Sequence, residues 1–321
     1  MVTRYIRNTV VLIKPEVTAG TDSVPTGAAN AMLVSVMEIT PLDAKNIDRN
    51  NIKGHFGANS QLIGPASVKC GITVELSGSG TASIAPMWGN PLLACAMAEG
   101  VLTVPDRVEY TPVSDTLKTV TIYYYDSGVL HKLLGAMGGV SLSAKEGEIP
   151  TLKFDFIGVD GVATAVANAT PTLTAWKPPV PMTKANVVDI TLGATYALGA
   201  FAGGTAYPSK GLQLSWGNAV NFTSNLTQEK VDITERVVTG SIELELTAAQ
   251  EVSFLTSVKA NTLQSLAFTI GLTTGYKILV HAPSMQLTNP KKVDINGTRY
   301  IGYDLRCMPV SGNDEIRLAC V

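Results

Sequence analysis

The residues best suited to chemistry are spaced too far apart to perform it. The three histidines, His55, His131 and His281, lie far apart in the sequence, and none has Asp, Glu or Cys neighbours at the spacing of a metal site. Several acidic residues could pair for acid–base catalysis, but a solvated strand face explains them more simply. These residues are Glu146, Glu148, Asp155 and Asp304.

The chain also lacks the short motifs that mark common enzymes. It contains no GxSxG, HExxH or P-loop motif, and no GxGxxG that opens a helix. The stretch Gly78-Ser79-Gly80 lies between a strand and a helix, but no Lys-Ser or Lys-Thr follows it, so we expect a flexible loop. Trp88, Trp176 and Trp216 are scattered and form no stacking ladder. The sequence therefore predicts no catalytic residue, no metal and no cofactor, and a protein that is not an enzyme.

The composition further limits the class of protein that the chain can be. The chain has 321 residues, of which 16% are charged and 45% hydrophobic, with 29 glycines and a net charge of -2. This length allows two domains, and the low charge with many glycines favours β structure. The small net charge implies no general affinity for nucleic acid. No apolar run approaches the ~20 residues of a membrane span, and residues 1–14 lack the features of a signal peptide.

The cysteines indicate a reducing environment. Cys70, Cys95, Cys307 and Cys320 form no CxxC pair, and each has apolar neighbours. We therefore expect buried free thiols rather than disulfides.

Two stretches of the chain resemble each other. Residues 68–76 (VKCGITVEL) match residues 238–246 (VTGSIELEL), and both alternate apolar with polar residues before a short helical pattern. Phe154-Asp155-Phe156 closes the first unit as Tyr303-Asp304-Leu305 closes the second. This repetition predicts a duplicated β unit.

The elements around these stretches follow the same plan. We expect strands in each half, a helix from Asn90 to Gly100, and a second helix that begins at the capping box Thr247–Gln250 and ends near Ala260. Residues 41–60 and 196–207 are expected to be loops, and the proline-rich run at 177–181 a stiff connector. The predicted fold is mainly β, with two tandem β-sandwich or barrel-like domains, residues 1–178 and 179–321, each with one short helix.

Three glutamates share a position within the repeated strands. Glu75, Glu243 and Glu245 alternate with the apolar residues that must be buried, so they point away from the core. In an isolated sandwich they would face water. If the strands instead line the inner wall of a ring, these residues are candidate lumen-facing side chains that make the wall mildly acidic and repel DNA.

Residues 129–158 suggest a family. They combine a hairpin with a small-residue break at 135–139, the turn Gly147-Glu148-Ile149-Pro150 and an aromatic closing strand. This run resembles tail tube proteins of long-tailed, siphovirus-like bacteriophages. Residues 237–246 and 277–307 look like the same unit with weaker motifs, in which Asp294-Ile295-Asn296-Gly297 replaces the turn.

The resemblance implies a structural virion protein with a duplicated tube domain. Proteins of this family stack as rings into a hollow tail tube, usually with six single-unit copies in a ring, so a duplicated chain needs three. Self-association into homotrimeric rings, contact with the tape measure and tail terminator proteins, and DNA passing through without specific binding are the implied interactions. The implied location is the virion tail after assembly in the host cytoplasm, with the loops at 41–60 and 196–207 as contacts between rings.

The alternative class is a β-sandwich binding module or a capsid-decoration protein. Such a module requires an aromatic platform or a metal-binding loop, and the sequence offers neither. A hydrolase would need a nucleophile next to a base, which is also missing.

Overall fold

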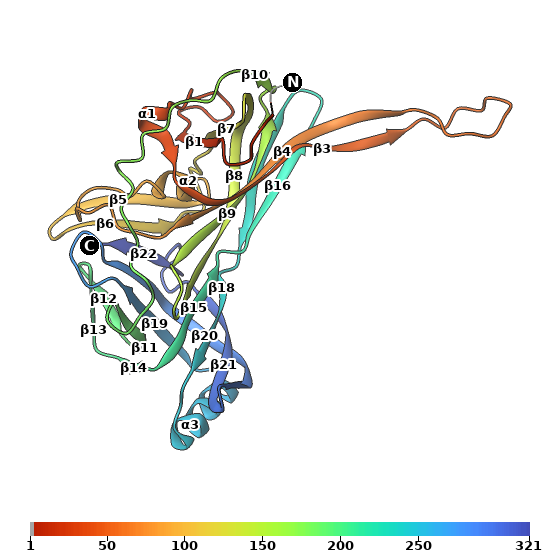
Figure 1. Cartoon of the computed structure of the whole chain (residues 1–321). Coiled ribbons are helices and arrows are strands. Elements are labelled where there is room, and N and C mark those ends of the chain that lie inside the picture. Colours follow the sequence, from red (N-terminus) through yellow and green to blue (C-terminus); the bar gives the residue numbers. More distant parts are fainter. Residues whose placement is uncertain (1–2) are drawn as a thin grey trace.

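The protein is an elongated β structure in which two halves are stacked along one axis (Figure 1). The computed structural model describes residues 3–321. Most strands join one large antiparallel sheet that does not close into a barrel, and two further hairpins form separate two-stranded sheets. The predicted mainly-β fold is thereby confirmed.

From residue 3 onward, the first half holds ten strands and two short helices. In chain order these are β1 Thr9–Pro15, α1 Gly27–Asn30, β2 Ala31–Met32, β3 Val34–Asp48, β4 Gln61–Glu75, α2 Gly89–Leu93, β5 Met97–Thr103, β6 Asp106–Pro112, β7 Val120–Asp126, β8 Val129–Lys145, β9 Thr151–Asp160 and β10 Thr164–Ala165.

The second half holds twelve strands and one helix. In chain order these are β11 Val187–Leu192, β12 Thr195–Ala197, β13 Ala200–Ala202, β14 Thr205–Tyr207, β15 Ser209–Ser215, β16 Asn218–Ser224, β17 Glu229–Arg236, β18 Thr239–Leu244, α3 Ala248–Lys259, β19 Leu263–Ile270, β20 Ile278–Ile295, β21 Thr298–Met308 and β22 Arg317–Cys320.

The two halves share one strand order. Neighbouring strands in the first half run β3-β4-β9-β8-β7-β1, and those in the second run β15-β18-β21-β20-β19-β11, with every pair antiparallel. A helix follows the second strand of each series, α2 after β4 and α3 after β18. The boundary at residue 178 stays a prediction: residues 166–186 form no strand or helix, yet strand pairing crosses this segment.

The repeated stretches also pair in the same register. Ile72 lies opposite Phe154 in the first half, and Ile242 lies opposite Tyr303 in the second. One step along, Gly71 faces Asp155 as Ser241 faces Asp304. The two matching stretches therefore have the same strand-pairing partners in their own halves.

The core follows from the alternation of side chains along these strands. Every second residue points to one face of a strand, so the apolar residues of β4 and β9 lie on one side of the sheet. Ile72, Val74, Phe154 and Phe156 are buried there, and the two phenylalanine rings stack 5.8 Å apart. The second half contributes its equivalents to the same core, which includes Ile242, Leu244, Tyr303 and Leu305.

The long strand β8 joins the two halves. Its first part pairs with β7, and its last part, from Ser141 to Lys145, pairs with β15 of the second half. The pairing of β8 with β9 shifts register between Leu134 and Met137, and such an irregularity bends the strand. Just after this bend, Gly138 packs directly against the Phe156 ring and the Asp155 carbonyl. A second junction pairs β22 with β6.

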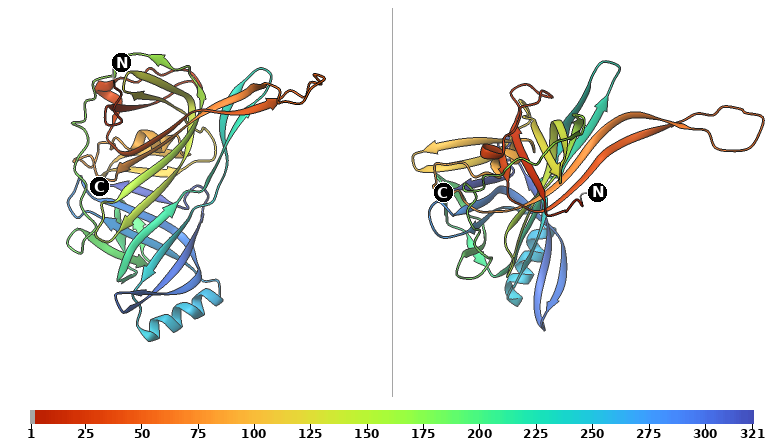
Figure 2. Two further views of the ribbon diagram at one scale, coloured as in Figure 1. Left: turned by 45° about the vertical axis from the view of Figure 1, so that its right-hand side comes forward. Right: turned by 45° about the horizontal axis from the view of Figure 1, so that its top comes forward.

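Residues 41–60 correct one expectation. The segment was predicted to be a loop, but β3 continues to Asp48 and β4 begins at Gln61, so the two strands form a long hairpin that leaves the body of the protein (Figure 1). We call residues 40–67 the long arm. Only 49–60 lack regular structure. The second half has a shorter projecting hairpin, β16–β17 (Figure 2).

Other expectations are corrected in detail. Residues 196–207, predicted to be a loop, form the β12–β13 hairpin and β14. The first helix ends at Leu93 rather than Gly100, because β5 begins at Met97, and α1 adds a helix that the sequence did not predict. Helix α3 begins at the predicted capping box, in which Thr247 and Gln250 bond reciprocally.

The bend in β8 leads to a test with neighbouring glycines. A Cβ at Gly138 would lie 2.5 Å from Phe156 Cδ1, whereas a Cβ at Gly139 would meet no atom within 4 Å. We expect Gly138→Ala to lower the free energy of unfolding by about 1–3 kcal/mol through overpacking, and Gly139→Ala to change it little. Urea unfolding of both variants measures this difference; equal stabilities would contradict the packing of Gly138 against Phe156.

Candidate functional site

A continuous polar surface covers the side of the sheet opposite the core. It extends over eight strands in the order β3-β4-β9-β8-β15-β18-β21-β20, so it runs without a break from one half to the other. We call this surface the polar face. Its side chains include Glu38, Thr40, Lys69, Thr73, Glu75, Ser141, Ser143, Lys153, Asp155, Gln213, Ser215, Ser241, Glu243, Thr288, Asp304 and Arg306.

The alternation of the strands places these residues on the polar face. In β9, Lys153 and Asp155 are exposed while Leu152, Phe154 and Phe156 are buried. In β15, Gln213 is exposed between two buried leucines, and it lies opposite Ser143 of β8. The strands of both halves are therefore in phase across their junction.

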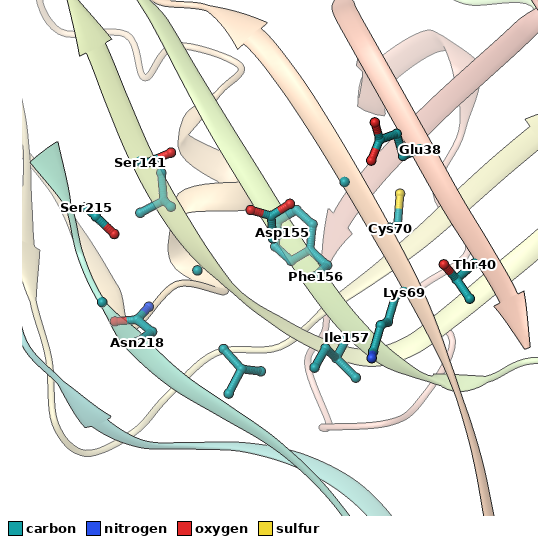
Figure 3. A pocket seen from close by; sticks show the side chains of 15 residues that line it. Glu38, Thr40, Lys69, Cys70, Ser141, Asp155, Phe156, Ile157, Ser215 and Asn218 are labelled. Atoms are coloured by element: carbon teal, nitrogen blue, oxygen red, sulfur yellow. The ribbon is translucent and has the colours of Figure 1, made fainter. Parts of the chain in front are cut away.

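The polar face is hollowed where β8 bends. A hollow of about 490 Å³ is lined by residues from β3, β4, β9, β8 and β15 and by the start of β16. Figure 3 shows Glu38, Asp155, Ser141 and Ser215 along this hollow, with Asn218 at its far side. The Asn218 amide donates hydrogen bonds to the carbonyls of Cys95 and Gly138, which fixes the β16–β17 hairpin beside the bend.

Both signs of charge occur on the polar face. Lys153 lies 3.2 Å from Asp155, and Lys69 lies 2.5 Å from Asp43 on the neighbouring strand. All four side chains are well exposed, so each pair contributes little to stability. A surface with mixed and solvated charges offers no strong field for DNA to bind.

The three predicted glutamates all lie on this side of the sheet. Glu75 ends β4, and Glu243 lies in β18 at the position opposite Gly302. Glu245 follows β18 directly and accepts a hydrogen bond of 3.2 Å from the Tyr300 hydroxyl. Lys153 and Arg306 also lie on the polar face, and the sequence analysis did not identify them. The alternation of apolar and polar residues around Phe154 in β9 and around Tyr303 in β21 is the signal that indicates both.

The histidines do not come together. His55 lies exposed near the tip of the long arm. His131 belongs to β8 and lies opposite Tyr124 of β7. His281 is buried between two aromatic rings, 5.6 Å from that of Tyr196 and 5.7 Å from that of Phe201. Burial and the nearby Arg317 guanidinium lower the pKa of His281 to about 4, so it is neutral at pH 7.

Next to His281, the Tyr196 hydroxyl binds the carboxylate of Glu109, which is part of a structural network. Glu109 accepts hydrogen bonds from Arg107 and from the Tyr196 hydroxyl, and it lies 3.4 Å from Arg317. Burial alone would raise the pKa of Glu109. The hydrogen bonds and the two arginines outweigh burial and hold this pKa below its usual range. Since Arg107 and Glu109 belong to the first half and Tyr196 and Arg317 to the second, the network attaches the halves to each other.

The other candidate groups also have structural partners. Each tryptophan donates a hydrogen bond from its Nε1. Trp88 donates to the Ser77 carbonyl, Trp176 to the Ala31 carbonyl and Trp216 to the Met97 sulfur. Glu146 pairs with Lys210. Within residues 3–321, no group of three or more His, Cys, Asp or Glu residues is placed to hold a metal ion. None of the helices in this part of the chain has the length and apolar character needed to cross a membrane.

All four cysteines are buried free thiols. Burial raises the pKa of Cys70 and of Cys307 to about 12, and it also raises the pKa of Cys95 and Cys320. At neutral pH none of them carries the thiolate that nucleophilic or redox chemistry needs.

Fold and surface together define a mainly-β protein whose main feature is one extended polar sheet face. A family model described as phage tail tube protein matches residues 6–308 of the chain. The chain belongs to the phage tail tube protein family, whose members are structural components of the virion tail and not enzymes. The resemblance seen in residues 129–158 is thereby confirmed. No curated protein sequence matches the chain.

The environment of His281 predicts a pH dependence. The pKa of this residue is lower when folded, about 4, than the 6.5 of a free histidine, so its contribution to stability is complete above pH 6.5. That contribution is lost as the pH falls from 6.5 towards 4, because the unfolded chain binds a proton that the folded chain does not. The free energy of unfolding of the unchanged protein should therefore fall between pH 7 and pH 5. We expect this fall to be smaller by about 2 kcal/mol in His281→Phe.

Urea unfolding of dilute protein at the two pH values measures this effect. The matched control is His55→Phe, since His55 is exposed. If both variants lose as much stability as the unchanged protein, His281 is not the residue that titrates.

Proposed function

We propose that the chain forms the wall of a phage tail tube, with copies joined into rings that stack around a channel for DNA. The observation that carries this proposal is the polar face, because one uninterrupted sheet surface spans both halves of a family member. On this proposal the polar face lines the channel, and the apolar side forms the body of the wall. Mixed, solvated charges then let DNA pass without specific binding.

We further propose that the two halves are duplicated tube units. Their common strand order and the shared register of Ile72–Phe154 and Ile242–Tyr303 support this view. Three copies would then provide the six units of a ring. The tape measure and tail terminator proteins, expected from the family resemblance, would contact the inside and the end of such a tube.

The long arm supports contacts between rings. Its tip carries Ile52 and Phe56, which are fully exposed to solvent, and its strands expose Leu62 and Ile63. Within residues 3–321 these apolar side chains are not covered, and such a surface usually contacts another protein. We propose that a copy in the neighbouring ring covers this arm.

Electron microscopy of the purified chain tests the proposal directly. We expect hollow tubes whose symmetry gives three chains in each ring, because each chain carries two strand series of the same order. Tubes with six identical chains in each ring would disprove the duplicated-unit proposal, and a protein that never assembles under tube-forming conditions would disprove the tube itself.

The position of the glutamates leads to a second test. Replacing Glu75, Glu243 and Glu245 together by Lys turns acidic side chains on the polar face into basic ones. We expect these tubes to retain DNA that is protected from nuclease, and to release it as salt rises. The matched control replaces exposed carboxylates away from the polar face, Asp106, Asp115 and Glu229, by Lys. Equal protection of DNA by both variants, or by neither, would contradict a channel lined by the three glutamates.

A further inference from the structure

The β12–β13 hairpin, residues 195–202, forms a separate two-stranded sheet at the side of the second half (Figure 1). We call it the latch hairpin. Its two strands pair only with each other, so side chains rather than strand pairing attach it to the main sheet. Most of the hairpin is exposed, and within it only Tyr196, Gly199 and Phe201 are partly buried. An element with so few buried contacts can open locally while the rest of the fold stays intact.

Two aromatic side chains of the latch hairpin pack on His281 of β20. The buried imidazole lies 5.6 Å from the Tyr196 ring and 5.7 Å from the Phe201 ring, measured between centroids. The Tyr196 ring also contacts the Arg317 guanidinium, whose Cζ lies 4.6 Å from the ring centroid. The Tyr196 hydroxyl donates a hydrogen bond of 2.7 Å to Glu109 of the first half. The latch hairpin therefore connects the two halves, and His281 is the surface on which it rests.

The charged groups around His281 include more cations than they can neutralise with one carboxylate. Arg317 of β22 is the direct cross-strand partner of His281. Arg317 and Arg107 both pair with the carboxylate of Glu109 on β6. Asp314, in the loop before β22, favours the charged form of His281, but less strongly than Arg317 opposes it. The latch hairpin and β19, which also pack against His281, contain no charged residue.

A proton on His281 is therefore unfavourable while the latch hairpin is closed. The Nε2 atom is buried and has no hydrogen-bond partner within residues 3–321, so a proton there would have no acceptor. The added charge would also lie beside Arg317 in surroundings that exclude water. Exposure of the imidazole to water removes both costs, and the hairpin is the element that covers it.

We propose that the latch hairpin is an acid-sensitive link, in which protonation of His281 opens the hairpin and separates Tyr196 from Glu109 while the β8–β15 junction stays paired. This device belongs to the single chain and does not depend on the assembly proposed above. Glu109 does not cause opening in mild acid, because its partners hold its pKa below the usual range and it stays ionised at pH 5.

Hydrogen–deuterium exchange of the dilute full-length chain at pH 7.5 and pH 5.0 tests this opening. The pKa of His281 is about 4 in the closed hairpin and 6.5 for a free imidazole, so the open form gains about 25- to 30-fold over this range. After correction for the chemical exchange rate, we expect the protection of residues 195–202 to fall by this factor. Residues 141–145 and 211–215, which form the β8–β15 junction, should keep theirs. Unchanged protection of the hairpin, or an equal loss at the junction, would overturn the proposal.

Three variants identify the residue that senses acid. His281→Phe keeps a ring for the hairpin to pack on but cannot bind a proton, so its protection should be the same at both pH values. His55→Phe, at an exposed position, should show the full fall. Tyr196→Phe loses the hydrogen bond to Glu109 and should exchange faster at both pH values, with the ratio between them unchanged. A full fall in His281→Phe, or no fall in Tyr196→Phe, would overturn the role of His281.

Titration of the histidine signals by nuclear magnetic resonance provides a measurement that needs no variant. We expect the imidazole of His281 to stay neutral in the closed form and to become protonated only together with the change in exchange of residues 195–202. An imidazole of His281 that takes up its proton near pH 6.5 without any change in the hairpin would show that the closed form accepts the charge, and would overturn the proposal.

Discussion

The alternation of side chains along each strand is the constraint on which the other features depend. In β4, β9, β15 and β18 it separates apolar residues from polar ones, so a single sheet acquires a buried side and a solvated side. A shift of one residue in any of these pairings would exchange the two sides. Because β8 and β15 pair in phase, the constraint extends over both halves, and the polar face is continuous.

Change of partner along a strand is the second organising feature. Strand β8 begins beside β7 and ends beside β15, which requires a bend that bulky residues would block. Gly138 allows the close approach of Phe156 at this bend, and Asn218 satisfies the Gly138 carbonyl from the neighbouring hairpin. The hollow of the polar face and the attachment of the second half therefore have a common local cause.

Alternation also explains how much of this could be predicted from the sequence. The repeated strands, the side on which Glu75 and Glu243 lie and the capping box of α3 all depend on local patterns, and the structure has them as expected. The long arm was missed because, up to Ala66, its strands pair only with each other and bury neither face, so they show no apolar period. The β8–β15 junction joins segments about seventy residues apart, and no local pattern indicates such a contact.

The β8–β15 junction lies within one polypeptide, and this affects how it responds to dilution. A contact between separate molecules dissociates when the protein concentration falls, whereas a tethered contact experiences an effective concentration fixed by the length of its linker. The segment between β10 and β11 is that linker, and it keeps the two strand series together at any concentration. Covalent linkage also lets each series evolve separately: one projects a long hairpin with an apolar tip, and the other projects a short one. Two identical molecules in contact could not differ in this way.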